Sequence, residues 1–157
     1  MSTDAAPAIR ADGTVLGFDV GARRIGVAVG SAFGSGARAL AVVDVHAAGP
    51  DWSRIEALRR EWRPDGLVVG DPMSLDGGDQ PIRRFAQAFA RELKRRTQLP
   101  VVMVDERNSS QEAARRFAEA RADGKRKRRD ADLLDAEAAA VIVERWLAAP
   151  QDATEIP

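Results

Sequence analysis

Apolar and polar positions alternate along the first third of the chain, and this pattern predicts β-strands at residues 14–20, 24–33 and 39–46. The short connections between them contain glycine and serine, which favours antiparallel neighbours. Two later runs, GLVVG at 66–70 and VVMV at 101–104, are wholly apolar, as strands buried on both faces are. The pattern therefore predicts five strands.

A helical period of apolar residues separates and follows the later strands. Helices are expected to begin near Ser53, Asp79, Ser109 and Ala131, the last of them running to Leu147. Ser53 and Glu56 match a capping box, and Pro64 is expected to stop the first helix. The predicted order is β-β-β-α-β-α-β-α-α, an α/β class in which helices cover both faces of a mixed sheet. Ligand sites in such sheets form beyond the carboxyl ends of the parallel strands.

The composition fits one soluble globular domain, with 157 residues of which 45% are hydrophobic and 31% charged. The absence of cysteine excludes disulfides and thiolate metal sites. No apolar run approaches the ~20 residues that span a membrane, and the N-terminus has no signal-peptide pattern. We expect a cytoplasmic protein with a disordered N-terminus at 1–13, a single domain at 14–147 and a flexible C-terminal tail at 148–157.

Three carboxylates stand where an apolar pattern should carry no charge. Asp19 closes the first strand, Glu106 follows the strand VVMV, and Asp135 lies on the apolar stripe of the last helix. Three inward acids would repel one another unless a cation lay between them, and hard oxygen ligands select Mg²⁺ or Mn²⁺. Two such ions roughly 3.5–4 Å apart would activate a water and stabilise the leaving oxygen in phosphodiester hydrolysis.

A simpler alternative for these acids remains open, in which each is paired separately with an arginine. The candidate partners are Arg23, Arg107 and Arg128. The chain has one histidine and no tyrosine, so few other side chains could supply acid–base chemistry. Ser109 and Ser110 are expected to cap a helix, because no Ser-His-Asp set can be assembled around them.

The charge distribution is uneven although the formal net charge is zero. Residues 121–129, RADGKRKRR, hold six basic side chains and one acid. We expect Lys125, Arg126 and Lys127 in this segment to contact substrate phosphates, although a solvated loop explains the run equally well. The tryptophans, at 52, 62 and 146, lie on apolar helix stripes, which favours packing over base stacking.

Four motifs, in order, resemble the YqgF/RuvX family of small ribonuclease H-like proteins, described as Holliday junction resolvases or pre-16S ribosomal RNA nucleases. They are FDVGARRIGVAVG at 18–30, VVGDPMSLDGGDQP at 68–81, VDERNSSQEA at 104–113 and DAEAAAVIVERWL at 135–147. The resemblance implies a ribonuclease H-like fold with a mixed five-stranded sheet whose first three strands are antiparallel. It also implies that Asp19, Glu106 and Asp135 are the catalytic and metal-ligating acids.

The family's basic residues fall on Arg23, Arg24 and Arg107, which are candidate phosphate contacts. Asp71 departs from the family pattern, which often has leucine there, and we expect it to cap the turn rather than to bind metal. Asp132 is a rival to Asp135 for the third ligand position, but the D-x-x-A-A register favours Asp135.

The sequence thus predicts an endonuclease dependent on Mg²⁺ or Mn²⁺ and acting on structured RNA, in maturation of the 5′ end of 16S ribosomal RNA. One alternative is a resolvase of four-way DNA junctions, which needs a symmetric dimer. Another is a non-catalytic module that binds ribosomal precursor or transcription machinery, with the acids retained for structure. No sequence feature decides between a monomer and a homodimer.

Overall fold

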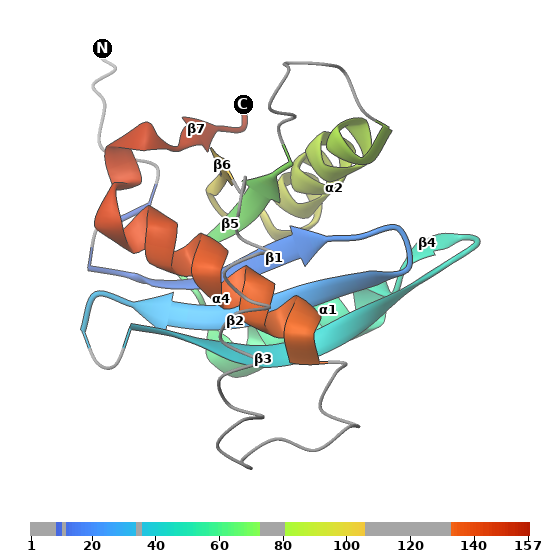
Figure 1. Ribbon diagram of the computed structural model, residues 1–157, viewed down its shortest axis with the longest axis horizontal. Coiled ribbons are helices and arrows are strands. Elements are labelled where there is room, and N and C mark those ends of the chain that lie inside the picture. Colours follow the sequence, from blue (N-terminus) through green and yellow to red (C-terminus); the bar gives the residue numbers. More distant parts are fainter. Residues whose placement is uncertain (1–8, 11, 34–35, 73–80, 106–132) are drawn as a thin grey trace.

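The computed structural model describes residues 9–10, 12–33, 36–72, 81–105 and 133–157, and its centre is a mixed β-sheet (Figure 1). The sheet order is β4-β3-β2-β1-β5-β6-β7. The strands are β1 (Thr14–Val20), β2 (Arg24–Ser31), β3 (Gly36–His46), β4 (Gly49–Pro50), β5 (Gly66–Asp71), β6 (Val101–Asp105) and β7 (Thr154–Glu155). The helices are α1 (Trp52–Trp62), α2 (Pro81–Thr97), α4 (Leu133–Ala148) and the 3₁₀-helix η2 (Pro150–Asp152).

All five predicted strands are present as the middle of this sheet. β1, β2 and β3 pair antiparallel, and β5 and β6 continue from β1 in parallel. The sheet has seven strands rather than the five expected, because the two-residue strands β4 and β7 pair with its two edges. Neither edge strand is long enough to show an apolar period, so the sequence pattern could not reveal them. The predicted helix near Ser109 lies outside the described residues.

Helices cover both faces of the sheet, as predicted. Figure 1 shows α4 crossing in front of the sheet and α1 behind it. The helices α1 and α2 pack on one face, where Ile55, Leu58, Phe89 and Leu93 join a core with alternate residues of β1, β2 and β5. The other face is covered by α4, whose expected apolar stripe is buried at Ala138, Ala139, Ile142 and Trp146.

Glycines in β1 and β2 let α4 approach the sheet closely. A Cβ on Gly26 would lie 1.8 Å from the Asp135 carbonyl oxygen, and a Cβ on Gly17 would lie 2.2 Å from Val143 Cγ2. In the same way, a Cβ on Gly30 would lie 2.6 Å from Val143 Cγ1. These contacts explain Gly26 and Gly30 of the motif FDVGARRIGVAVG, since a side chain at either position would push α4 away.

The start of α1 differs from the predicted capping box. Its N-cap is Asp51, whose Oδ1 accepts a hydrogen bond from the Arg54 backbone N–H at 3.2 Å. Ser53 therefore lies inside the first turn, because an aspartate two residues earlier already satisfies a free N–H of the helix end. The helix ends at Trp62, before Pro64 as predicted, with Arg63 in the left-handed region at φ 46°.

The C-terminal residues, expected as a flexible tail at 148–157, contain the 3₁₀-helix η2 and the edge strand β7. β7 pairs with β6, the Ile156 backbone N–H donates to the Val101 carbonyl at 2.9 Å, and the Ile156 side chain is buried. Ile9, within the segment expected to be disordered, is buried against Gly66. Among the described helices, none is both long and apolar enough to cross a membrane.

Candidate active site

Asp19 lies near the end of β1 on the face of the sheet that α4 covers. Side chains alternate along β1: Leu16 and Phe18 enter the core under α1 and α2, while Val15 and Gly17 meet α4. Asp19 continues the second set and is half-buried. A carboxylate here therefore projects toward the start of α4 rather than into the core under α1 and α2.

Asp135 is in the first turn of α4, and its backbone lies directly over Gly26. Gly26 is the cross-strand partner of Asp19 in the antiparallel pairing of β1 with β2. Directly opposed residues of such a pair are neighbours, with Cβ positions about 5 Å apart. The fold thus brings Asp19 and Asp135, 116 positions apart in the sequence, to adjacent places on one face of the sheet. The positive end of the α4 dipole also favours a carboxylate at this place.

Arg24 completes this cluster from the first position of β2. Its Nε donates to the Asp135 Oδ2 at 2.9 Å, with the Arg24 side chain 52% exposed and that of Asp135 34% exposed. An ion pair this open to solvent stabilises a fold by only about 0.2–1 kcal/mol. The pair therefore contributes little to the stability of the fold.

This pair bears on the alternative in which each acid has its own arginine. Asp135 has such a partner, but it is Arg24 and not one of the three arginines proposed from the sequence. The sequence placed Arg23 and Arg24 close to Asp19, in the motif FDVGARRIGVAVG. Nothing in the sequence spacing, however, told which of two neighbouring arginines would meet the last helix.

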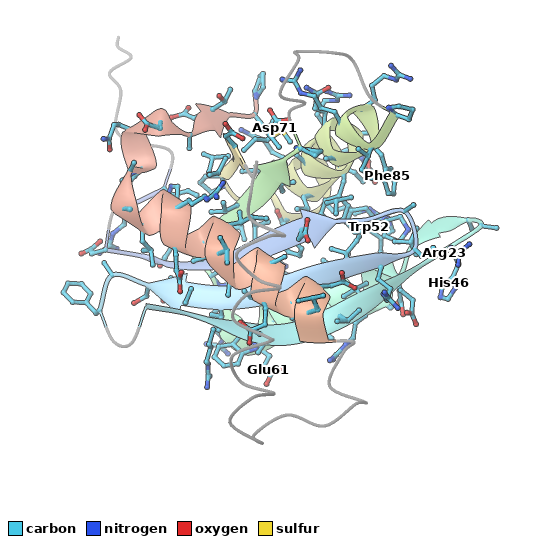
Figure 2. The ribbon with its side chains drawn as sticks, viewed as in Figure 1. Arg23, His46, Trp52, Glu61, Asp71 and Phe85 are labelled. Atoms are coloured by element: carbon cyan, nitrogen blue, oxygen red, sulfur yellow. The ribbon has the colours of Figure 1, made fainter. Side chains whose placement is uncertain are left out.

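Arg23 lies at the tip of the β1–β2 hairpin, where Figure 2 labels it beside His46. Its side chain is exposed, and within the described residues it forms no side-chain hydrogen bond or ion pair. Its carbonyl accepts from the Val45 N–H at 2.9 Å, which ties the turn to β3. Arg23 is thus placed to contact a ligand that approaches this end of the sheet.

The turn between the two arginines and Asp19 depends on Gly21, but not through a positive φ. Gly21 is not among the positive-φ glycines of the described residues. Its N–H donates to the Arg24 carbonyl at 2.9 Å, and a Cβ on Gly21 would lie 2.7 Å from that oxygen. The close approach of Gly21 to the backbone of Arg24 is what requires glycine here.

Asp71 ends β5 and lies on the opposite face of the sheet from Asp19. Its two carboxylate oxygens accept from Arg83 of α2 at 2.9 and 3.3 Å, and its side chain is 15% exposed. In Figure 2 the residue is apart from Arg23. Asp71 therefore holds the first turn of α2 to the sheet, and no sequence pattern pointed to Arg83 as its partner.

The remaining predicted site residues lie outside the described residues. They are Glu106, Arg107, Lys125, Arg126, Lys127 and the rival ligand Asp132. Within the part of the chain that the structure describes, no group of three acidic or histidine residues could hold a metal ion. Two of the three predicted acids, Asp19 and Asp135, are therefore brought to adjacent places, and Glu106 lies outside the described residues.

The sheet has three antiparallel strands continued by two parallel ones, and helices cover both of its faces. Together with an acid at the end of the first strand, this arrangement defines a ribonuclease H-like fold. Solved structures agree: the Thermus thermophilus RuvC structure matches with a TM-score of 0.56 and 20% identity, covering 91% of this chain and 99% of that chain. The same figures hold for T. thermophilus RuvC in complex with a Holliday junction substrate. At this identity the likeness shows the fold alone.

The sequence matches the RuvX family, described as "Holliday junction resolvase", over residues 13–149, and the chain belongs to this family. It is 68% identical over 152 residues to the "Putative pre-16S rRNA nuclease" of Xanthomonas axonopodis pv. citri (strain 306), covering 97% of this chain and 98% of that protein. The protein of the same name from Xanthomonas euvesicatoria pv. vesicatoria (strain 85-10) is 67% identical with the same coverage. The resemblance noted in the sequence is thereby confirmed, and it supports a hydrolase of the nuclease class.

Proposed function

We propose that this protein is a divalent-metal-dependent endonuclease that cleaves structured RNA in maturation of the 5′ end of 16S ribosomal RNA. The observation that carries the proposal is the meeting of Asp19 on β1 with Asp135 on α4, at one face and one end of the sheet. The relatives named as pre-16S rRNA nucleases, 67–68% identical over nearly the whole chain, support the choice of substrate.

The donor chemistry of this place fits Mg²⁺ or Mn²⁺. Carboxylate oxygens are the hard ligands that these ions prefer, and Asp135 already accepts a cationic partner there. Asp19 and Asp135 would hold the metal together with Glu106. Bound ions of this kind activate water and stabilise the leaving oxygen of a phosphodiester.

The basic residues orient the substrate in this proposal. Arg23, at the hairpin tip, and Arg24, beside Asp135, contact phosphate oxygens of the substrate. Arg107 and the segment of Lys125, Arg126 and Lys127 add further phosphate contacts. Such contacts fix the position and register of the backbone without reading base sequence.

Two other functions are favoured by particular observations. The family description favours a resolvase of four-way DNA junctions, which would require a symmetric pair of sites. The Arg24–Asp135 ion pair is what a non-catalytic binding module would use to keep its acids neutralised. Both share the fold and differ from the main proposal in substrate or in chemistry.

A cleavage assay separates the three functions. The purified protein, with Mn²⁺ or Mg²⁺, is given a 16S precursor fragment and a synthetic four-way junction. Asp19→Asn is expected to lower the cleavage rate by about 10³-fold or more, as loss of a group central to the chemistry does. The matched control is Asp71→Asn, which changes a strand-end aspartate on the opposite face and should retain cleavage.

The outcomes are distinct. Cleavage of the RNA that survives Asp19→Asn would contradict the catalytic assignment. Cleavage of the junction but not of the precursor fragment would favour the resolvase. Binding without cleavage of either substrate, with metal bound to the protein, would favour the binding module.

A further inference from the structure

A groove with arginines on both sides lies between α1 and α2, on the opposite face of the sheet from Asp19. It has a volume of about 250 Å³ and is lined by Trp52, Ile55, Glu56, Arg60, Arg96 and Thr97. A second hollow of about 470 Å³, lined by Arg59, Arg60, Arg63 and Pro64, shares Arg60 with it. We refer to the two together as the arginine groove.

The two helices that form this groove concentrate positive charge in a chain of zero net charge. Together α1 and α2 carry nine arginine and lysine residues against three glutamates. Glu56 is shared by Arg59 and Arg60, and Glu92 is shared by two arginines of α2. Each of these glutamates neutralises only one of its two partners, so both walls of the groove keep a net positive charge.

The arginines are held in place but remain accessible. The side chain of Arg60 is 74% exposed and that of Arg96 is 43% exposed, although both have a glutamate one turn away. Arg63 lies just past α1, exposed, and within the described residues its side chain has no ion pair. Guanidinium groups oriented in this way lose less freedom when they bind an anion, and their planar forks suit phosphate.

The aromatic ring in the groove is not available to a nucleic-acid base. Phe89 stacks against the Trp52 ring with centroids 5.3 Å apart, and the Arg96 guanidinium lies over the same ring at 4.4 Å from its centroid. Recognition here would therefore be of phosphate rather than of base. The groove also has no exposed large apolar side chain to anchor a protein partner, since the large apolar side chain exposed among the described residues is Phe33, which does not line it.

We infer that the arginine groove is a second binding site for the phosphate backbone of RNA, apart from the cleavage site and on the other side of the sheet. An extended, folded RNA would contact both faces of the protein, whereas a short fragment would reach one. The identity of the ligand as RNA rests on the proposed function. Contact with phosphate rests on the charges and geometry of the groove itself.

Binding of RNA in the absence of divalent metal tests the inference independently of cleavage. A labelled, folded RNA of several helical turns is titrated with protein in EDTA over a range of salt, and fluorescence anisotropy gives the affinity. The test protein carries Arg60→Gln, Arg63→Gln and Arg96→Gln. Each lost phosphate contact should reduce the slope of log affinity against log salt by about 0.7–0.9. The triple variant should therefore lose about two units of slope and bind at least about tenfold more weakly at low salt.

Two controls separate charge from folding. The same three positions changed to lysine should keep the wild-type salt slope. Arg10→Gln removes an exposed arginine that pairs with Asp12, outside the groove, and should leave binding unchanged. Unfolding midpoints measured for all variants show whether a loss of binding comes from a loss of structure, and the lysine variant must retain the wild-type fold.

Wild-type affinity and salt slope in the folded glutamine variant would overturn the inference, whatever the protein cleaves. Weaker binding of the folded RNA with a reduced salt slope would support it even if the protein never cleaves, and failure of the proposed function is thus seen separately.

Discussion

Replacement of Arg24 by glutamine separates two roles of Asp135, its ion pair with Arg24 and its proposed binding of a divalent metal. The change removes the guanidinium that lies 2.9 Å from the Asp135 carboxylate and keeps a polar side chain. An exposed pair of this kind contributes about 0.2–1 kcal/mol, and for a chain of this size that corresponds to a fall in unfolding midpoint of at most about 4 °C. The variant should therefore fold.

The same change should strengthen metal binding, whereas it slightly lowers the stability of the fold. In the wild type a bound divalent ion must share Asp135 with a fixed positive charge. Two unit charges about 4 Å apart interact by about 1 kcal/mol in water and about 4 kcal/mol at an effective dielectric constant of 20. Because the Arg24 side chain is 52% exposed, we take the lower figure. Because Mn²⁺ carries two charges, this figure doubles to about 2 kcal/mol, and removal of the Arg24 charge should tighten Mn²⁺ binding about 30-fold.

Isothermal titration calorimetry with Mn²⁺ measures this change, and thermal unfolding without metal measures the stability. Arg23→Gln is the matched control, because Arg23 is the adjacent arginine and has no ion pair within the described residues. It should weaken RNA binding and change the affinity for Mn²⁺ less than Arg24→Gln does. Unchanged or weaker Mn²⁺ binding in Arg24→Gln would refute the idea that arginine and metal compete for Asp135. A fall of 10 °C or more in unfolding midpoint would instead show that Arg24 is mainly structural.

Three further predictions concern the packing and charges around the sheet. Gly26→Ala should lower the unfolding free energy by about 3 kcal/mol in urea denaturation and weaken Mn²⁺ binding, because the new Cβ would lie 1.8 Å from the Asp135 carbonyl oxygen; wild-type stability would contradict this packing. Ile156→Ala should cost about 2 kcal/mol in the same measurement, since the side chain is 8% exposed, and a cost below about 0.5 kcal/mol would show that the C-terminus is not packed in solution. Hydrogen bonds from Arg95 and then Arg96 lower the pKa of Glu92 to about 2 from its ordinary 4.5, so its contribution to stability is present above pH 4.5 and is lost as the pH falls toward 2. Glu92→Gln should therefore flatten the dependence of the unfolding midpoint on pH between these values, and an unchanged pH profile would count against the ion pairs.

The strands that form the middle of the sheet were predictable because they are long enough for their apolar pattern to repeat. β1 has the predicted bounds, and the predicted first residues of β2, β5 and β6 are also correct. Errors fell on features that span one or two residues. The N-cap at Asp51, the edge strand β7 and the buried Ile156 each depend on a single contact that no periodic pattern reports.

The candidate site was predictable only in part, for a similar reason. Asp19 and Asp135 could be marked from the sequence because each breaks an apolar pattern, and a charge in such a pattern needs a partner. Their partners could not be predicted, because which arginine reaches which acid depends on the position of α4 over the sheet. Arg24 rather than Arg23 meets Asp135, and Asp71 faces Arg83 on the other side.

The arginine groove was not visible in the sequence for a related reason. Its basic residues lie on two helices and read as ordinary solvated faces, since they are interspersed with apolar residues and glutamates. Only the packing of α1 beside α2 brings Arg60 and Arg96 to the two sides of one groove.

By itself the sequence determined the order of elements, the two helix-covered faces and the acids that do not fit the core, because these follow from local periods and from the cost of burying charge. The tertiary structure decided which charged groups meet. Gly26 shows the physical reason: a residue with no side chain lets the backbone of Asp135 lie against β2, beside the cross-strand position of Asp19. That contact joins residues from the two ends of the chain, and no local pattern encodes it.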